Sequence, residues 1–128
     1  MMTSNIQEIE SVLKLEGEQR YKYFIKKIIG NDEVWGLYNN GWALVSDDKG
    51  DKLFPIWPAK EYAKLCSNSG WENYQPQSFT IDSFLEDLLP QLRSNKMSFA
   101  VFITPSSLGV TPTLEQIEND INTELMKY

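Results

Sequence analysis

Residues 33–58, EVWGLYNNGWALVSDDKGDKLFPIWP, hold the clearest strand and turn pattern in the chain. Two short runs within this stretch, 33–38 and 42–46, are rich in the aromatic and aliphatic residues that strands favour. The tripeptide between them, Asn-Asn-Gly at 39–41, tolerates the positive φ angles of a tight turn. The pattern therefore predicts an antiparallel hairpin.

A second polar turn extends this hairpin into a third strand. The sequence DDKGD at 47–51 leads into KLFPI at 52–56, so we expect an antiparallel three-strand meander. Pro55 lacks an N–H group, which favours a position at a sheet edge or at a bulge for the third strand. The acidic turn resembles a calcium loop only superficially, because the twelve-residue spacing and the terminal glutamate are missing.

Amphipathic helices are expected on the N-terminal side of the meander. Ser4 and Gln7 fit a capping box for a helix that runs to Leu15. A second helix is predicted over 18–29, because its apolar residues recur at helical spacing. Gly30-Asn31 is expected to end this second helix.

On the C-terminal side of the meander, helices alternate with strands. Trp57-Pro58 is predicted to form the corner between the third strand and a helix. Pro90 is expected to end or kink a later helix. The expected elements are a helix at 58–67, a strand near 77–80, a helix at 83–92, a strand at 98–104 and a helix at 113–127.

The predicted order ααβββαβαβα indicates an α+β fold, with an antiparallel or mixed sheet packed against several helices. A chain of 128 residues is short enough to form one domain over 1–128. No repeat, linker or low-complexity tract divides it.

The composition excludes several kinds of chemistry. The chain has no histidine, which removes Ser-His-Asp and Cys-His nucleophile systems and histidine-ligated zinc. The single cysteine, Cys66, shares a helical stripe with Tyr62 and Leu65, and we expect it to be buried. No phosphate-binding glycine pattern occurs. We therefore predict no catalytic residue, no cofactor and no metal site.

The charge is acidic and unevenly distributed. The chain has 12 basic and 18 acidic residues, a net charge of −6. Residues 31–128 carry fourteen acidic and seven basic residues, which disfavours nucleic acid and anionic membrane surfaces as partners. An acidic surface instead favours encounter with a basic protein. No secretory leader or membrane span is expected, which favours a cytoplasmic location.

Tryptophan is concentrated in the middle of the chain. Four of these residues lie between Trp35 and Trp71, and an exposed aromatic cluster rimmed by carboxylates would be typical of a protein-binding surface. In an antiparallel meander, 33–35 would lie beside 45–47 and gather acidic side chains at one end. The candidate partner-binding residues are Asp32, Glu33, Trp42, Asp47, Asp48, Asp51, Trp57, Glu61, Tyr62 and Trp71.

Short motifs along most of the chain belong to one pattern: RYKYFIKK at 20–27, VWGL at 34–37, GWAL at 41–44, PIWPAKEYA at 55–63, FLEDLLPQL at 84–92 and VF at 101–102. Over about 19–125 the chain resembles the bacterial family catalogued as domain of unknown function 2750. The resemblance implies a small, stand-alone, bacterial cytoplasmic domain and brings no activity, catalytic residue or cofactor. The chain departs from the family pattern at Ile103, where a proline is expected.

Three functional hypotheses remain. The first is a non-catalytic protein-binding domain, including an immunity-type inhibitor of a basic toxin. The alternative is a small-molecule or peptide binder whose aromatic pocket is lined by Trp42, Trp57, Tyr62 and Trp71. The third is an enzyme that uses carboxylates alone. The sequence does not determine the oligomeric state.

Overall fold

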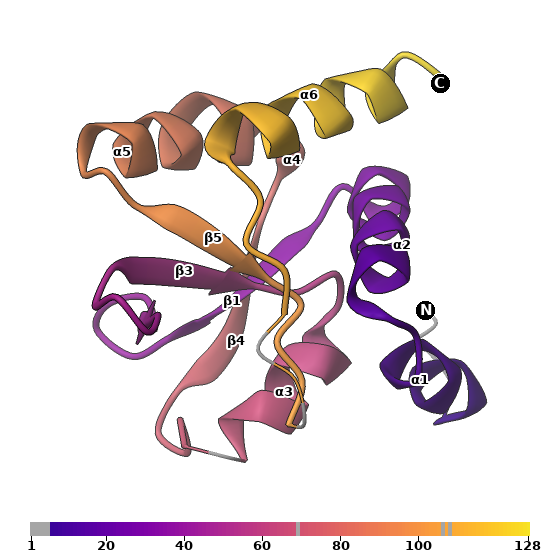
Figure 1. The fold of residues 1–128 in the computed structure, drawn as a ribbon. Coiled ribbons are helices and arrows are strands. Elements are labelled where there is room, and N and C mark those ends of the chain that lie inside the picture. The colour runs from indigo at the N-terminus through magenta and orange to yellow at the C-terminus, as the bar shows by residue number, and fades with distance from the viewer. Residues whose placement is uncertain (1–5, 69, 106, 108) are drawn as a thin grey trace.

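The computed structural model describes residues 6–68, 70–105, 107 and 109–128 (Figure 1). The helical segments are α1 (Ile6–Leu13), α2 (Gly17–Asn31), α3 (Lys60–Ser67), α4 (Ile81–Ser83), the π-helical turn η1 (Phe84–Leu88), α5 (Leu89–Ser94) and α6 (Leu114–Leu125). The strands are β1 (Val34–Tyr38), β2 (Val45–Ser46), β3 (Lys52–Ile56), β4 (Gln75–Phe79) and β5 (Ser98–Val101). The predicted α+β class is confirmed. Ser4, the expected helix cap, lies outside the described residues.

The strands form two small sheets. β1 pairs antiparallel with β4, while β3 lies between antiparallel β2 and parallel β5. A bridge between Trp35 and Trp57 connects the two sheets, with reciprocal backbone hydrogen bonds of 3.0 and 2.8 Å. In Figure 1, α5 and α6 lie above the strands and α3 lies below them.

The first pairing of the predicted meander begins with an antiparallel bridge between Tyr38 and Trp42 but does not continue as a ladder. The turn at 39–41 does form, and Asn40 has the positive φ of 56° that the sequence indicates. The N–H of Ala43 still donates to the carbonyl of Leu37 at 2.8 Å, but beyond it the chain leaves β1, so that β1 pairs with β4 and β2 pairs with β3. Gly36 gives a physical reason, because the Trp42 indole packs where a β-carbon on residue 36 would stand. The indole thus lies across β1 rather than beside it.

Pro55 was expected at an edge or a bulge, yet β3 is the central strand of its sheet. The N–H of Trp57 points toward β1, and alternate residues of a strand point the same way. The Pro55 nitrogen therefore faces the side on which β2 reaches only Leu53. No ladder hydrogen bond is lost there, which allows a proline in a central strand.

Two helix ends differ from the sequence prediction. Helix α2 passes through Gly30 and ends at Asn31, and Asp32 takes the left-handed conformation of the C-cap with φ 54°. The helix that contains Pro90 does not end there but continues to Ser94. The π-helical turn η1 comes directly before Pro90, and its wider hydrogen-bond pattern absorbs the interruption that a proline without an N–H causes.

The core lies between β3, β5 and the helices around them. Its largest fully buried side chains include Trp57, Tyr62, Phe84 and Phe99. Strand β5 is shorter than predicted, because Phe102 adopts a φ of 65° and turns the chain after Val101. Among the described residues, no helix combines the length and apolar character needed to cross a membrane.

Candidate partner-binding surface

The turn at 47–51 is closed by hydrogen bonds within its own backbone and to the Asp47 side chain. Oδ1 of Asp47 accepts hydrogen bonds from the N–H groups of Lys49 and Asp51, both at 2.9 Å. The backbone N–H of Asp47 also donates to the carbonyl of Asp51 at 2.9 Å. The side chains of Asp47, Asp48 and Asp51 are all exposed, so this turn presents acidic groups to solvent.

The expected acidic end of the meander does not form. Asp32 and Glu33 precede β1, which bridges to Trp57 just past the carboxyl end of β3. The acidic turn enters the opposite end of β3 at Lys52. The five residues of β3 therefore separate the acidic turn from Asp32 and Glu33 by roughly 15 Å. Moreover, Oδ1 of Asp32 accepts the N–H of Ile81 at 3.0 Å, which gives that carboxylate a structural role at the start of α4.

The predicted four-ring pocket is also wrong, because its members belong to different aromatic groups. Trp57 and Tyr62 are 0% and 1% exposed, which rules them out as contact residues for a partner in this conformation. The indole N–H of Trp57 donates to the carbonyl of Ile103 at 2.7 Å, and the half-buried Trp71 packs edge-on against Trp57. Trp42 contacts other rings. Glu61 is half-buried in the first turn of α3.

Trp42 is half-buried and lies in an aromatic group of its own. Its ring centroid is 5.1 Å from that of Tyr38, 5.6 Å from Phe54 and 5.5 Å from Phe79. A β-carbon at Gly36 would come within 2.9 Å of the Trp42 ring, so the indole packs directly on the β1 backbone. Tyr38, which is 37% exposed, and Leu44, which is 41% exposed, are large apolar side chains of the same segment.

A pocket of about 160 Å³ opens beside Trp42. We call it the Trp42 pocket, and its lining residues are Trp42, Phe79, Ser83, Asp87, Leu88 and Gln91. Phe79 is the last residue of β4, and the others apart from Trp42 come from the α4–η1–α5 helix. The Ser83 hydroxyl donates to Oδ2 of Asp87 at 3.3 Å, which orients the carboxylate.

Sequence reasoning missed five of these six residues. The spacing of Ser83 and Asp87 by four positions does indicate that they share one helix face. Nothing in the sequence indicates that Trp42 would meet that face, because the β1–β4 pairing that carries Phe79 toward it was not predicted.

A second cavity, of about 640 Å³, lies between α2 and α6. Both basic and acidic side chains line it, and the Tyr21 hydroxyl donates to Asp120 at 2.6 Å across the two helices. Burial, followed by the bond to Asp120, raises the pKa of Tyr21 well above its usual range. With both signs of charge present, this groove shows no preference for a charged ligand.

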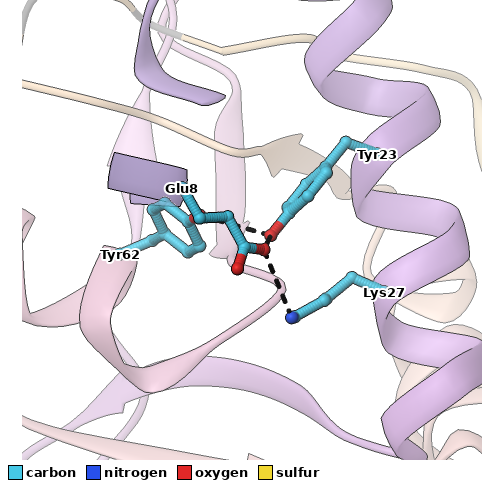
Figure 2. A network of polar contacts seen from close by, with 4 residues as sticks. All are labelled: Glu8, Tyr23, Lys27 and Tyr62. Carbon is cyan, nitrogen blue, oxygen red and sulfur yellow. Dashed lines mark hydrogen bonds and ion pairs between the residues drawn. The ribbon is translucent and has the colours of Figure 1, made fainter. Parts of the chain in front are cut away.

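Figure 2 shows a polar network that connects α1, α2 and α3. The Tyr23 hydroxyl donates to Oε2 of Glu8 at 2.6 Å, lies 3.3 Å from the Tyr62 hydroxyl, and shares the Glu8 oxygen with Lys27 at 3.5 Å. Burial, followed by the bond to Glu8, raises the pKa of Tyr23 far above its usual range. The bond from Tyr23 is the main cause of the lowered pKa of Glu8. The tyrosine therefore stays protonated at neutral pH and acts as a structural link.

The Cys66 thiol and the Arg20 guanidinium also form hydrogen bonds within the fold. Cys66 is buried, as the sequence predicts, and its thiol donates to the carbonyl of Ile103 at 3.2 Å. Burial raises its pKa to about 11, which leaves little nucleophilic thiolate at neutral pH. Arg20 is buried and donates to the Leu15 carbonyl and the Ser107 hydroxyl. Within the described part of the chain, no three acidic or cysteine side chains gather as metal ligands would.

A comparison with models of protein families shows to which family the chain belongs. Residues 21–121 match the model of a protein family of unknown function, DUF2750. The chain belongs to this family. The match confirms the resemblance seen in the motifs, and it covers both the acidic turn and the Trp42 pocket. No curated protein matches the chain.

Proposed function

We propose that this DUF2750 protein is a non-catalytic, cytoplasmic protein-binding domain that recruits a basic protein through segment 38–51. One observation carries the proposal. The exposed apolar side chains of Tyr38 and Leu44 occur in the same short segment as the exposed carboxylates of Asp47, Asp48 and Asp51. Apolar anchors with a polar surround are typical of binding surfaces.

The charge of the segment favours a basic partner. Lys49 is the single basic residue within 38–51, against three aspartates. Carboxylates around an apolar contact accelerate encounter with a positively charged protein and disfavour acidic competitors. Small size, a net charge of −6 and the same exposed segment also support a narrower proposal, an immunity-type inhibitor that covers the surface of a basic toxin.

Capture experiments test the proposal. The intact protein and the double variant Asp47→Asn/Asp48→Asn are immobilised side by side and exposed to a lysate of the source cells. The matched control is Glu10→Gln/Glu115→Gln, which makes the same charge change at exposed positions on α1 and α6. A basic protein retained by the wild type and the control, and lost by the double variant, would support the proposal.

Kinetics with the captured partner make the test sharper. Association should slow as ionic strength rises, because salt screens steering over roughly 8–10 Å. The double variant should reduce the association rate more than it raises the dissociation rate. Kinetics indifferent to both salt and the double substitution would place the binding site elsewhere and contradict the proposal.

A further inference from the structure

The Trp42 pocket has walls suited to a flat, positively charged group. The rings of Trp42 and Phe79 meet at 82° with centroids 5.5 Å apart, so they form a corner rather than a closed stack. Phe79 is also stacked on Phe84, whose ring is parallel to it within 5° at a centroid distance of 6.1 Å. Aromatic faces attract guanidinium and ammonium groups through the ring quadrupole, most strongly in the case of tryptophan.

The polar side of the pocket carries one charge, and that charge is negative. Asp87 forms no ion pair within the described part of the chain, and its carboxylate accepts a hydrogen bond from the neutral Ser83 hydroxyl. The basic residue closest to it along this helix, Arg93, is paired with Glu118 at 3.2 Å. Gln91 adds an amide that can accept a hydrogen bond. The lining includes no basic side chain.

The size of the pocket limits its occupant. A cavity of about 150 Å³ accepts a molecule as large as benzene, so 160 Å³ suits the end of one side chain. The pocket shares Trp42 with segment 38–51, and Trp42 contacts the exposed Tyr38 at 5.1 Å. A partner that covers this segment would therefore lie next to the pocket.

We infer that the Trp42 pocket receives an arginine side chain of the basic partner. The inference rests on the proposed function. The guanidinium stacks against the aromatic corner, donates to the Asp87 carboxylate and is positioned by the Gln91 amide. Arginine fits better than lysine, because its planar, weakly hydrated fork can stack and donate at the same time, whereas an ammonium group is a compact, strongly hydrated charge.

A small probe tests the pocket without the partner. N-acetyl-arginine amide is titrated into the intact protein while backbone and indole N–H signals are followed by NMR. We expect millimolar binding, with shifts centred on the Trp42 indole N–H and the backbone of Ser83 and Asp87. N-acetyl-citrulline amide has nearly the same shape without the charge, and it should bind at least tenfold more weakly.

Variants separate the carboxylate from general charge effects. Asp87→Asn should weaken the arginine probe at least tenfold, while Glu86→Gln removes a charge from the adjacent exposed position of η1 and should leave binding unchanged. Trp42→Leu should abolish the indole contact, and its amide spectrum shows whether the fold survives. Equal binding of citrulline, equal binding of N-acetyl-lysine amide, shifts elsewhere on the surface, or normal binding by Asp87→Asn would each overturn the inference.

The inference and the proposed function can fail separately. If Asp47→Asn/Asp48→Asn loses the captured partner but Asp87→Asn keeps it at full affinity, the binding function stands and the arginine pocket is wrong. If the arginine probe binds as expected but no basic protein depends on the acidic turn, the pocket stands and the proposed function is wrong.

Discussion

Segments 38–51 and 57–66 are similar in residue types but differ in exposure. Both combine aromatic side chains with acidic ones. In 57–66, Trp57 and Tyr62 are buried, and the Trp57 indole and the Cys66 thiol both donate to the carbonyl of Ile103. In 38–51, Tyr38 and Leu44 are exposed, and β2 extends for only two residues.

The difference between the two segments comes from what covers them. Residues about forty positions later in the chain pack on the Trp57 corner, where the carbonyl of Ile103 accepts the Trp57 indole N–H and the N–H of Phe102 donates to the carbonyl of Ile56. In segment 38–51, Phe54 and Phe79 pack against Trp42, while Tyr38 and Leu44 stay exposed. Aromatic content therefore predicts contact area, but the rest of the chain decides whether that area faces the core or a partner.

The largest loss of stability is expected for a substitution of Trp57. Trp57→Ala removes a fully buried indole and leaves the Ile103 carbonyl without that donor, so it should cost about 3–5 kcal/mol of unfolding free energy. Trp42→Ala, in the half-buried segment, should cost clearly less. Thermal and urea denaturation of both variants measure the contrast. Equal losses would show that the two tryptophans are equally part of the core.

Gly36→Ala should have an intermediate effect, because it disturbs the contact that holds Trp42 in place. The added β-carbon would lie 2.9 Å from the Trp42 ring, which also packs against Tyr38, Phe54 and Phe79. We expect a loss of about 1–3 kcal/mol and a shifted Trp42 indole N–H signal. Gly41→Ala is the matched control, because its β-carbon would meet nothing within 4 Å. A Gly36→Ala variant as stable as this control would contradict the packing.

A substitution in the network of Figure 2 should have a smaller effect on stability, and this effect should depend on pH. The pKa of Glu8 is lowered in the folded protein, chiefly by the Tyr23 hydroxyl. Its contribution to stability is therefore present above the ordinary value of 4.5 and is lost as pH falls through the lower folded-state pKa. Glu8→Gln should cost less than about 1 kcal/mol at pH 7, because the carboxylate is partly exposed. Urea denaturation at pH 7 and pH 3 should show the difference from wild type shrinking in acid, and a constant difference would contradict this assignment.

The smallest effect on stability is expected in the acidic turn. Asp47→Asn/Asp48→Asn keeps a side-chain oxygen at position 47 for the N–H groups of Lys49 and Asp51. We expect a change within about 0.5 kcal/mol, measured by thermal denaturation. A larger loss would show that the carboxylates maintain the turn itself, and the binding experiment would then need single variants.

Local patterns predicted the elements better than their partners. The positive φ at Asn40, the helix cap at Thr113 and the burial of Cys66 all depend on a few neighbouring residues. The Thr113 hydroxyl accepts the N–H of Gln116 at 3.0 Å and caps α6 at the start of the helix expected over 113–127. The pairing of β1 with β4 depends instead on residues about forty positions apart, and the alternating pattern of a strand carries no information about which strand it meets.

The sequence alone determined the α+β class, the family, the acidic charge and the absence of histidine chemistry, because composition, periodicity and motifs are local properties. Only the tertiary structure separated Trp57 from Trp42, moved Asp32 and Glu33 away from the acidic turn, and brought Asp87 to the aromatic corner of Trp42 and Phe79. Those placements follow from strand pairings across long stretches of chain, and from Gly36, whose missing side chain allows an indole to lie on the sheet.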